Sequence, residues 1–203
     1  MTPASNSAYP TDVRAALLAS ARAELLEYGA GGLSLRAMAT RAGVSRATPK
    51  WHFGNRAGLL TALAVEGFAQ LGEALGAAAE GSTDPAARFT ALGRAYMDFG
   101  LGNPELFDLM FRSTELDRDD PTLIRAHRES FSILVDTATG APEGMRAGTG
   151  DVPLLAWAAA HGLVLLVHGG ALQTLTGLTT PDDASALAHR LADTFTGLIQ
   201  TSG

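Results

Sequence analysis

A helix-capping residue followed directly by proline occurs four times after residue 60 of this 203-residue chain. Asp, Asn and Thr side chains can accept hydrogen bonds from the free N–H groups of a first helical turn. Proline suits the next position because its missing N–H would have no partner there. No segment alternates like a sheet strand. The sequence therefore predicts an all-α fold. The four pairs are Asp84-Pro85, Asn103-Pro104, Asp120-Pro121 and Thr180-Pro181.

These signals, together with apolar periodicity, predict about nine helices. The first is expected from Thr11 to Gly29, and two short helices follow it. Asn55 can cap a long connecting helix from Arg56 to about Ala79. The glycine-rich stretch from Gly140 to Asp151 is the expected internal loop. The remaining five helices are expected at residues 85–101, 104–112, 121–138, 153–177 and 181–200.

Composition and helix grouping predict the domain organisation. We expect a flexible arm at residues 1–10, a three-helix domain at 11–60 and a helical body at 61–203. With 46% hydrophobic residues the chain can bury a sizeable core, and it has no cysteine for disulfides or thiolate metal sites. The N-terminal sequence lacks the basic and apolar regions of a signal peptide, so a cytoplasmic location is expected.

The segment from Ser34 to Arg56 predicts two short helices joined by a turn. Leu35, Met38, Ala39 and Ala42 have the spacing of an apolar helix face. Gly43 supplies the backbone freedom for a sharp reversal. Both Ser34 and Ser45 are expected as N-caps, one for each helix.

The second of these helices carries more polar groups than packing requires. Arg46, Lys50 and His52 offer cations or hydrogen bonds to phosphates, while Thr48 and Trp51 can reach base edges and sugars. This combination favours double-stranded DNA as the partner. Trp51 has two open roles, since it can also brace the helix against Phe53.

Charge is distributed unevenly along the chain. Residues 11–60 hold seven cations and three acids, a net charge of +4, although the whole chain carries −6. The remainder must therefore carry −10. Duplex DNA should attract the N-terminal domain and repel the body, which orients the encounter.

The segment resembles the helix-turn-helix of the tetracycline-repressor-like (TetR) family of transcriptional regulators. Pro49 lies where most members have an aliphatic residue, although one branch of the family resembles this chain in having proline there. The chain departs from the common pattern at three positions: Lys50 stands where tyrosine is usual, Trp51 where arginine or a similar polar residue is frequent, and Arg56 where lysine is usual. These departures leave phosphate binding intact and affect base preference. The matching positions are Leu35, Ala39, Ala42, Gly43, Val44, Ser45, Thr48, His52, Phe53, Asn55 and Leu59.

The resemblance extends into the body. Residues 103–111 and 156–163 are similar to a C-terminal domain of this family that is named for a Trp-His-Gly signature, here Trp157, His161 and Gly162. The resemblance implies a homodimer in which the last two helices of each copy form a four-helix bundle. It also implies a cavity in each body for a small-molecule effector, whose binding alters the spacing of the two DNA-binding domains.

The apolar stretch from Leu154 to Leu172 supports dimerisation on physical grounds. It has no charged side chain when His161 and His168 are neutral, so it must be covered on every side. A body of this size does that most simply with a second copy. A membrane span is the alternative, but two histidines and the absence of flanking cations weigh against it.

The predicted site residues form two sets. His161 and His168 could also share a metal, but two histidines without nearby acids favour ordinary buried side chains, and no metal or cofactor is predicted. The DNA-binding set is Ser34, Arg36, Ser45, Arg46, Ala47, Thr48, Lys50, Trp51, His52, Asn55 and Arg56. The candidate ligand-pocket set is Tyr96, Phe99, Phe107, Met110, Phe111, Trp157 and His161, for which plain core packing is the alternative.

The sequence thus predicts a dimeric DNA-binding regulator. We expect a repressor that leaves a palindromic operator when a small apolar or amphipathic ligand binds. The alternative is a helical ligand-binding or scaffold protein whose helix-turn-helix no longer recognises an operator. An enzyme is not expected, because the usual nucleophile, metalloprotease and phosphate-loop motifs are missing from the sequence.

Overall fold

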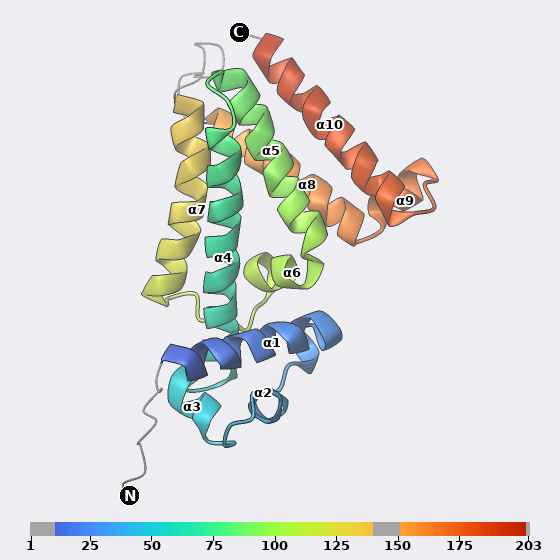
Figure 1. Cartoon of the computed structure of the whole chain (residues 1–203). Coiled ribbons are helices and arrows are strands. Elements are labelled where there is room, and N and C mark those ends of the chain that lie inside the picture. The colour runs from blue at the N-terminus through green and yellow to red at the C-terminus, as the bar shows by residue number, and fades with distance from the viewer. Residues whose placement is uncertain (1–10, 140–150, 202–203) are drawn as a thin grey trace, which may run out of the picture. The chain divides into compact units, whose positions relative to one another are not determined.

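The computed structural model describes residues 11–139 and 151–201, and within these residues the chain forms ten helices and no strand (Figure 1). The predicted arm at residues 1–10 lies outside the described residues, as does nearly all of the predicted loop at residues 140–151. The helices are α1 (Thr11–Gly32), α2 (Leu35–Arg41), α3 (Thr48–Phe53), α4 (Arg56–Glu80), α5 (Pro85–Gly102), α6 (Pro104–Arg112), α7 (Pro121–Thr139), α8 (Asp151–His168), α9 (Ala171–Thr176) and α10 (Pro181–Thr201).

The four capping-residue–proline pairs do mark helix starts, since α5, α6, α7 and α10 each begin with proline. The Asp84 carboxylate accepts from the amide of Ala87 at 2.9 Å, and Asp120 and Thr180 cap their helices in the same way. Asn103 is the exception. Its side-chain amide donates to the carbonyl of Phe99 at 2.9 Å, so it satisfies the end of α5 instead of the start of α6.

The prediction of one helix over residues 153–177 is wrong. The structure divides this stretch into α8 and α9, which makes ten helices where about nine were expected. The break falls at Gly169 and Gly170, and Gly170 has a φ of +68°. Because this left-handed backbone is open to glycine at little cost, the adjacent glycines allow the chain to turn here.

The described chain forms two compact units, and α4 contributes residues to both. The first unit contains residues up to 67 together with residues 105–123. Gly67 of α4 lies against α6, where a Cβ atom would stand 2.5 Å from the sulfur of Met110. The almost fully buried side chains of this unit include Leu17, Leu25, Met38, Leu59, Leu60, Leu63, Phe107 and Leu109.

The second unit contains residues 68–104 and residues from 124 onward, with α5, α8 and α10 packed on one another. In the same unit α7 runs alongside α4, and the ring of His127 stacks on Phe68 with centroids 4.6 Å apart (Figure 1). The buried side chains here include Leu71, Phe89, Leu92, Met97, Val164, Ala184 and Ala188.

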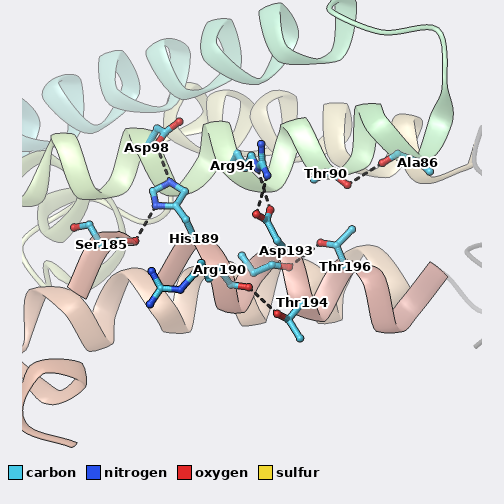
Figure 2. Close-up of polar contacts among 11 residues, drawn as sticks. Ala86, Thr90, Arg94, Asp98, Ser185, His189, Arg190, Asp193, Thr194 and Thr196 are labelled. Atoms are coloured by element: carbon cyan, nitrogen blue, oxygen red, sulfur yellow. Dashed lines mark hydrogen bonds and ion pairs between the residues drawn. The ribbon is translucent and has the colours of Figure 1, made fainter. Parts of the chain in front are cut away.

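Two polar bridges join α5 to α10 in the second unit (Figure 2). Arg94 donates to both carboxylate oxygens of Asp193, at 2.9 and 2.7 Å. One turn away, the Nε2 atom of His189 lies 2.8 Å from a carboxylate oxygen of Asp98. These bridges run along the exposed side of the contact between the two helices, beside their apolar packing.

In the described part of the chain, no helix is both long and apolar enough to cross a membrane, which was the alternative for residues 154–172. The described part of the chain also contains no group of three or more His, Asp or Glu side chains placed to hold a metal ion.

Candidate DNA-contact surface and ligand region

The helix-turn-helix segment forms as predicted up to its turn. Ser34 caps α2, because its hydroxyl accepts from the amide of Ala37 at 3.4 Å. Gly43 has a φ of +68°, which reverses the chain after α2. The amide of Val44 then donates to the carbonyl of Ala39 at 3.0 Å, closing the turn.

The prediction that Ser45 caps the next helix is wrong. That helix, α3, starts at Thr48, with Ala47 in the capping position and no side-chain cap. Proline at position 49 explains the shift, because it cannot donate the N–H that would bond to the Ser45 carbonyl in a helix starting there. The amide of Thr48 bonds to that carbonyl instead, at 3.1 Å, and the hydroxyls of Ser45 and Thr48 lie 2.9 Å apart.

The inner side of α3 is anchored on the core of the first unit. Phe53 is 8% exposed, and Pro49 is also buried. The guanidinium of Arg14, on α1, lies over the Phe53 ring at 5.4 Å from its centroid. These contacts hold α3 against α1 without using the predicted DNA-binding side chains.

The outer side of α2, α3 and the turn between them exposes cations. Arg36, Arg46 and Lys50 are exposed, and none of them makes an ion pair with another described residue. Trp51 is 89% exposed, so the alternative in which it packs against Phe53 is wrong. An indole this exposed contributes nothing to the core of the chain and is available to a partner.

Two other cations of the N-terminal domain form ion pairs within the first unit. Arg22 pairs with Glu66 at 2.6 Å, and Arg41 bridges two acids of α1, which are Glu24 at 3.0 Å and Glu27 at 2.8 Å. The hydrogen bond from Tyr28 and then that from Arg41 lower the pKa of Glu27. Arg22 of α1 and Arg41 of α2 are therefore compensated by acids, while the exposed Arg36, Arg46 and Lys50 are not.

Arg56 also has internal partners. Its guanidinium donates to the backbone carbonyls of Ala30 and Leu33 and pairs with Glu115 at 2.7 Å. Sequence reasoning did not find Glu115, because it lies 59 positions away and outside the helix-turn-helix pattern.

The other predicted DNA-binding residues lie around the exposed cations. Ala47 is exposed and Thr48 is partly exposed. Asn55 is exposed but caps α4, as predicted, through a 2.9 Å bond from the amide of Gly58. The partly buried His52 lies with its ring centroid 6.2 Å from that of Phe53. The DNA contacts of this set remain predictions.

Three of the predicted ligand-pocket residues meet in the second unit. The indole N–H of Trp157 donates to the hydroxyl of Tyr96 at 3.2 Å, and that hydroxyl lies 2.8 Å from Nδ1 of His161. The Trp157 and His161 rings lie 5.2 Å apart, and Phe131 meets Trp157 edge-on at 6.0 Å. The structure therefore joins α5, α7 and α8 through an aromatic cluster with a polar centre.

Burial keeps this cluster uncharged. It raises the pKa of Tyr96 well above its ordinary value, so the hydroxyl keeps its proton, and it lowers the pKa of His161 below 6.5. The cluster thus combines flat apolar faces with neutral hydrogen-bonding groups, which suits an apolar or amphipathic molecule better than a strongly charged one.

The remaining candidates are divided between the units. Phe99, on α5, is buried in the second unit. Phe107, Met110 and Phe111 belong to the first unit, on α6, where the two phenylalanine rings lie 4.7 Å apart. Phe107 and Met110 are fully buried, as the core-packing alternative requires. Their part in a ligand pocket remains a prediction.

A helix-turn-helix with an exposed basic face, joined to an all-helical body, defines a class of DNA-binding regulators. The sequence matches two families within that class. Residues 17–63 match "Bacterial regulatory proteins, tetR family", and residues 89–196 match "Tetracyclin repressor-like, C-terminal domain". The chain therefore belongs to the TetR family, whose members are transcription regulators and not enzymes.

Solved structures agree with this assignment. A protein of unknown function from Rhodococcus sp. RHA1 is 34% identical, with 95% of this chain and 97% of that chain covered and a TM-score of 0.74. The regulator FadR from Bacillus subtilis, in complex with stearoyl-CoA, is 16% identical over 89% and 96% of the two chains, with a TM-score of 0.65.

A variant of TetR from Acinetobacter baumannii, in complex with minocycline, is 17% identical. The alignment covers 92% of this chain and 96% of that chain, with a TM-score of 0.63. These two distant structures establish the likeness of fold alone. Among the curated proteins, none matches the sequence.

Proposed function

We propose that this chain is a homodimeric repressor that binds a palindromic operator and leaves it when a small apolar or amphipathic ligand binds. Residues 11–60 would supply the DNA-binding domain, residues 61–203 the ligand-binding and dimerisation body, and the protein would act in the cytoplasm. Two copies of α3 would enter successive major grooves about 34 to 36 Å apart.

One observation carries the DNA-binding proposal. Within the N-terminal domain Arg22, Arg41 and Arg56 have acidic partners, whereas Arg36, Arg46 and Lys50 have none among the described residues. They belong to the same helix-turn-helix segment as the exposed Trp51, the one large apolar side chain on α3 that the core does not use. Unpaired cations can contact the phosphates of DNA, and an exposed flat side chain can contact base edges or sugars.

Dimerisation is supported by leucines of the second unit. Leu155 and Leu166 on α8 are 58% and 40% exposed, and Leu191 and Leu198 on α10 are 40% and 61% exposed. Positions 191 and 198 are seven residues apart and so lie on one side of their helix. Such side chains are stabilised when a second copy covers them, and a twofold-symmetric pairing uses the same surface twice.

The ligand proposal rests on the cluster of Tyr96, Trp157 and His161, which offers aromatic faces beside neutral polar groups. Two proteins of the same fold were crystallised with small molecules, FadR with stearoyl-CoA and TetR with minocycline. A ligand that prefers a conformation unable to hold both half-sites weakens operator binding, and the operator weakens ligand binding by the same factor.

Gel-shift titration on the DNA upstream of the protein's own gene tests the proposal. We expect tighter binding than to random duplex of equal length. Arg46→Ala and Lys50→Ala should each weaken binding and reduce the salt slope by about one unit, the value of one phosphate contact. Arg125→Ala, which removes an exposed cation of α7, is the matched control and should leave the slope unchanged.

The alternative function, a helical ligand-binding or scaffold protein, predicts a different result. The chain would not discriminate its upstream DNA from random duplex at any salt concentration, and sedimentation would be unchanged by added DNA. Selection of bound fragments from random DNA would then return no common sequence, which would overturn the repressor proposal.

A further inference from the structure

The guanidinium of Arg56 is held by three parts of the first unit. Its Nη1 atom donates to the carbonyl of Leu33, in the connection between α1 and α2, and its Nη2 atom to that of Ala30, in the last turn of α1. Its Nε and Nη2 atoms donate to the carboxylate of Glu115, at 2.7 and 3.4 Å. Four hydrogen bonds thus occupy most of the five N–H groups of the side chain.

The two carbonyls identify what Arg56 fixes. Ala30 lies in the last turn of α1 and Leu33 directly follows that helix, so Arg56 donates to two carbonyls where α1 gives way to α2. The residue after Leu33 is Ser34, the N-cap of α2. The arginine therefore ties the first residue of α4 to the point where the helix-turn-helix begins.

Glu115 holds the other side of the arginine, and its own segment is fixed separately. The amide of Asp117 donates to the hydroxyl of Thr61 at 2.9 Å, and Thr61 is 2% exposed. Leu116, which lies between Glu115 and Asp117 in the sequence, is buried, at 6% exposed. The carboxylate is thus presented to Arg56 from a fixed piece of chain, and the pairing lowers the pKa of Glu115.

Charge argues against a free cation at this position. The carboxylate of Glu115 balances the guanidinium of Arg56, so the pair has little net charge to offer a phosphate. A phosphate contact from Arg56 would also require at least part of this hydrogen-bonding arrangement to break. Arg46 and Lys50 carry no such cost, since no ion pair of theirs exists among the described residues.

We propose that Arg56 is a positioning residue and not a phosphate contact, and that the Arg56–Glu115 pair holds the entry of α2 in the conformation that binds DNA. The inference rests on the proposed operator binding and reassigns one residue of the predicted DNA-binding set. Glu115, which is outside the helix-turn-helix, becomes a determinant of operator affinity.

Glu115→Gln is expected to change operator affinity in opposite directions for a phosphate-contact role and a positioning role of Arg56. If Arg56 touched phosphate, removing the acid would release a cation and tighten operator binding. As a positioning pair, the same change weakens specific binding by about threefold or more, although it removes a negative charge. Binding to random duplex should change little, so the ratio of specific to random affinity falls. A loss of fold stability alone would leave that ratio unchanged in a folded sample.

The salt slope and a double-mutant cycle complete the test. Arg56→Gln should lower affinity without the loss of about one unit of slope expected for Arg46→Ala. The double variant should be little weaker than either single variant, because the two residues act as one pair. Asp108→Asn, which removes the exposed ion pair of Arg112 on α6, is the control and should change neither quantity.

The outcomes separate the two proposals. If wild-type protein does not discriminate an operator, or Arg46→Ala leaves the slope unchanged, the proposed DNA-binding function fails. If wild type binds its operator but Arg56→Gln reduces the slope by about one unit, or Glu115→Gln tightens binding, the positioning role is overturned. Melting curves identify any Arg56→Gln sample that is not folded, and the near-isosteric Glu115→Gln then decides the question.

Discussion

The chain has two surfaces that its own core does not use, and they are opposite in chemistry. One is the outer side of the helix-turn-helix, on α2, α3 and their turn, and the other is formed by the exposed leucines of α8 and α10. The first presents Arg36, Arg46, Lys50 and Trp51, and the second presents large aliphatic side chains. Unpaired cations favour a polyanion, whereas apolar side chains favour another apolar surface. The comparison suggests two different partners for one chain, namely DNA and a second copy.

The largest effect is expected from a charge placed on the apolar surface. Leu191→Glu should convert the proposed dimer to a monomer, because a carboxylate would be buried without a partner at the proposed interface. Operator affinity should fall by about 100-fold or more, since two linked domains bind far more tightly than one. Sedimentation velocity measures the first effect and gel shift the second. Leu26→Glu, at a 60% exposed position of α1, is the control, and an equal effect there would remove the distinction between the surfaces.

A smaller effect is expected from the aromatic residue of the basic surface. Trp51→Ala should weaken specific binding by about tenfold, because the indole face no longer contacts bases or sugars. The salt slope should stay constant, since no charge is lost. Thermal stability should be nearly unchanged because the side chain is 89% exposed. Equal affinities of wild type and variant would mean that Trp51 takes no part in recognition.

The cluster of the second unit should make stability depend on pH. Burial lowers the pKa of His161 below 6.5, so the native state disfavours its charged form. Below about pH 6.5 the unfolded chain binds more protons at this site, and stability must fall as pH decreases. Urea unfolding at pH 7.5 and at pH 5 measures this loss. His161→Gln should make the loss smaller, and an unchanged pH dependence would contradict the assignment.

The smallest effect is expected at the polar bridges between α5 and α10. Asp193→Asn removes the pair with Arg94, but both side chains are well exposed, so the free energy of unfolding should fall by at most about 1 kcal/mol. The difference should shrink at high salt because exposed pairs are screened. A dimer that dissociates in this variant would mean that the bridges, and not the leucines, control assembly.

Local patterns predicted the secondary structure well where the cause was local. Capping residues and prolines gave the starts of α5, α7 and α10, and Gly43 gave the turn of the helix-turn-helix. The errors also have local causes that compete with the pattern. Pro49 moved the start of α3 from Ser45 to Thr48, and the glycines at 169 and 170 ended α8 early.

The functional surface was predictable in part. The sequence indicated which cations lie on the helix-turn-helix, but not which of them have partners, because those partners come from distant positions. Arg22 pairs with Glu66 and Arg56 with Glu115, contacts that only the packed fold creates. The exposure of Trp51 was equally undecided, since its neighbour Phe53 on the same short helix is buried.

The exposed side chains of α2 and α3 have a consequence for the history of such proteins. Because Arg36, Arg46, Lys50 and Trp51 form no part of the core, replacing any of them costs the fold little. Substitutions at these positions can therefore change which promoter a related protein binds, while the buried Phe53, Met38 and Leu59 are retained. The architecture separates what a descendant must inherit from what it is free to alter.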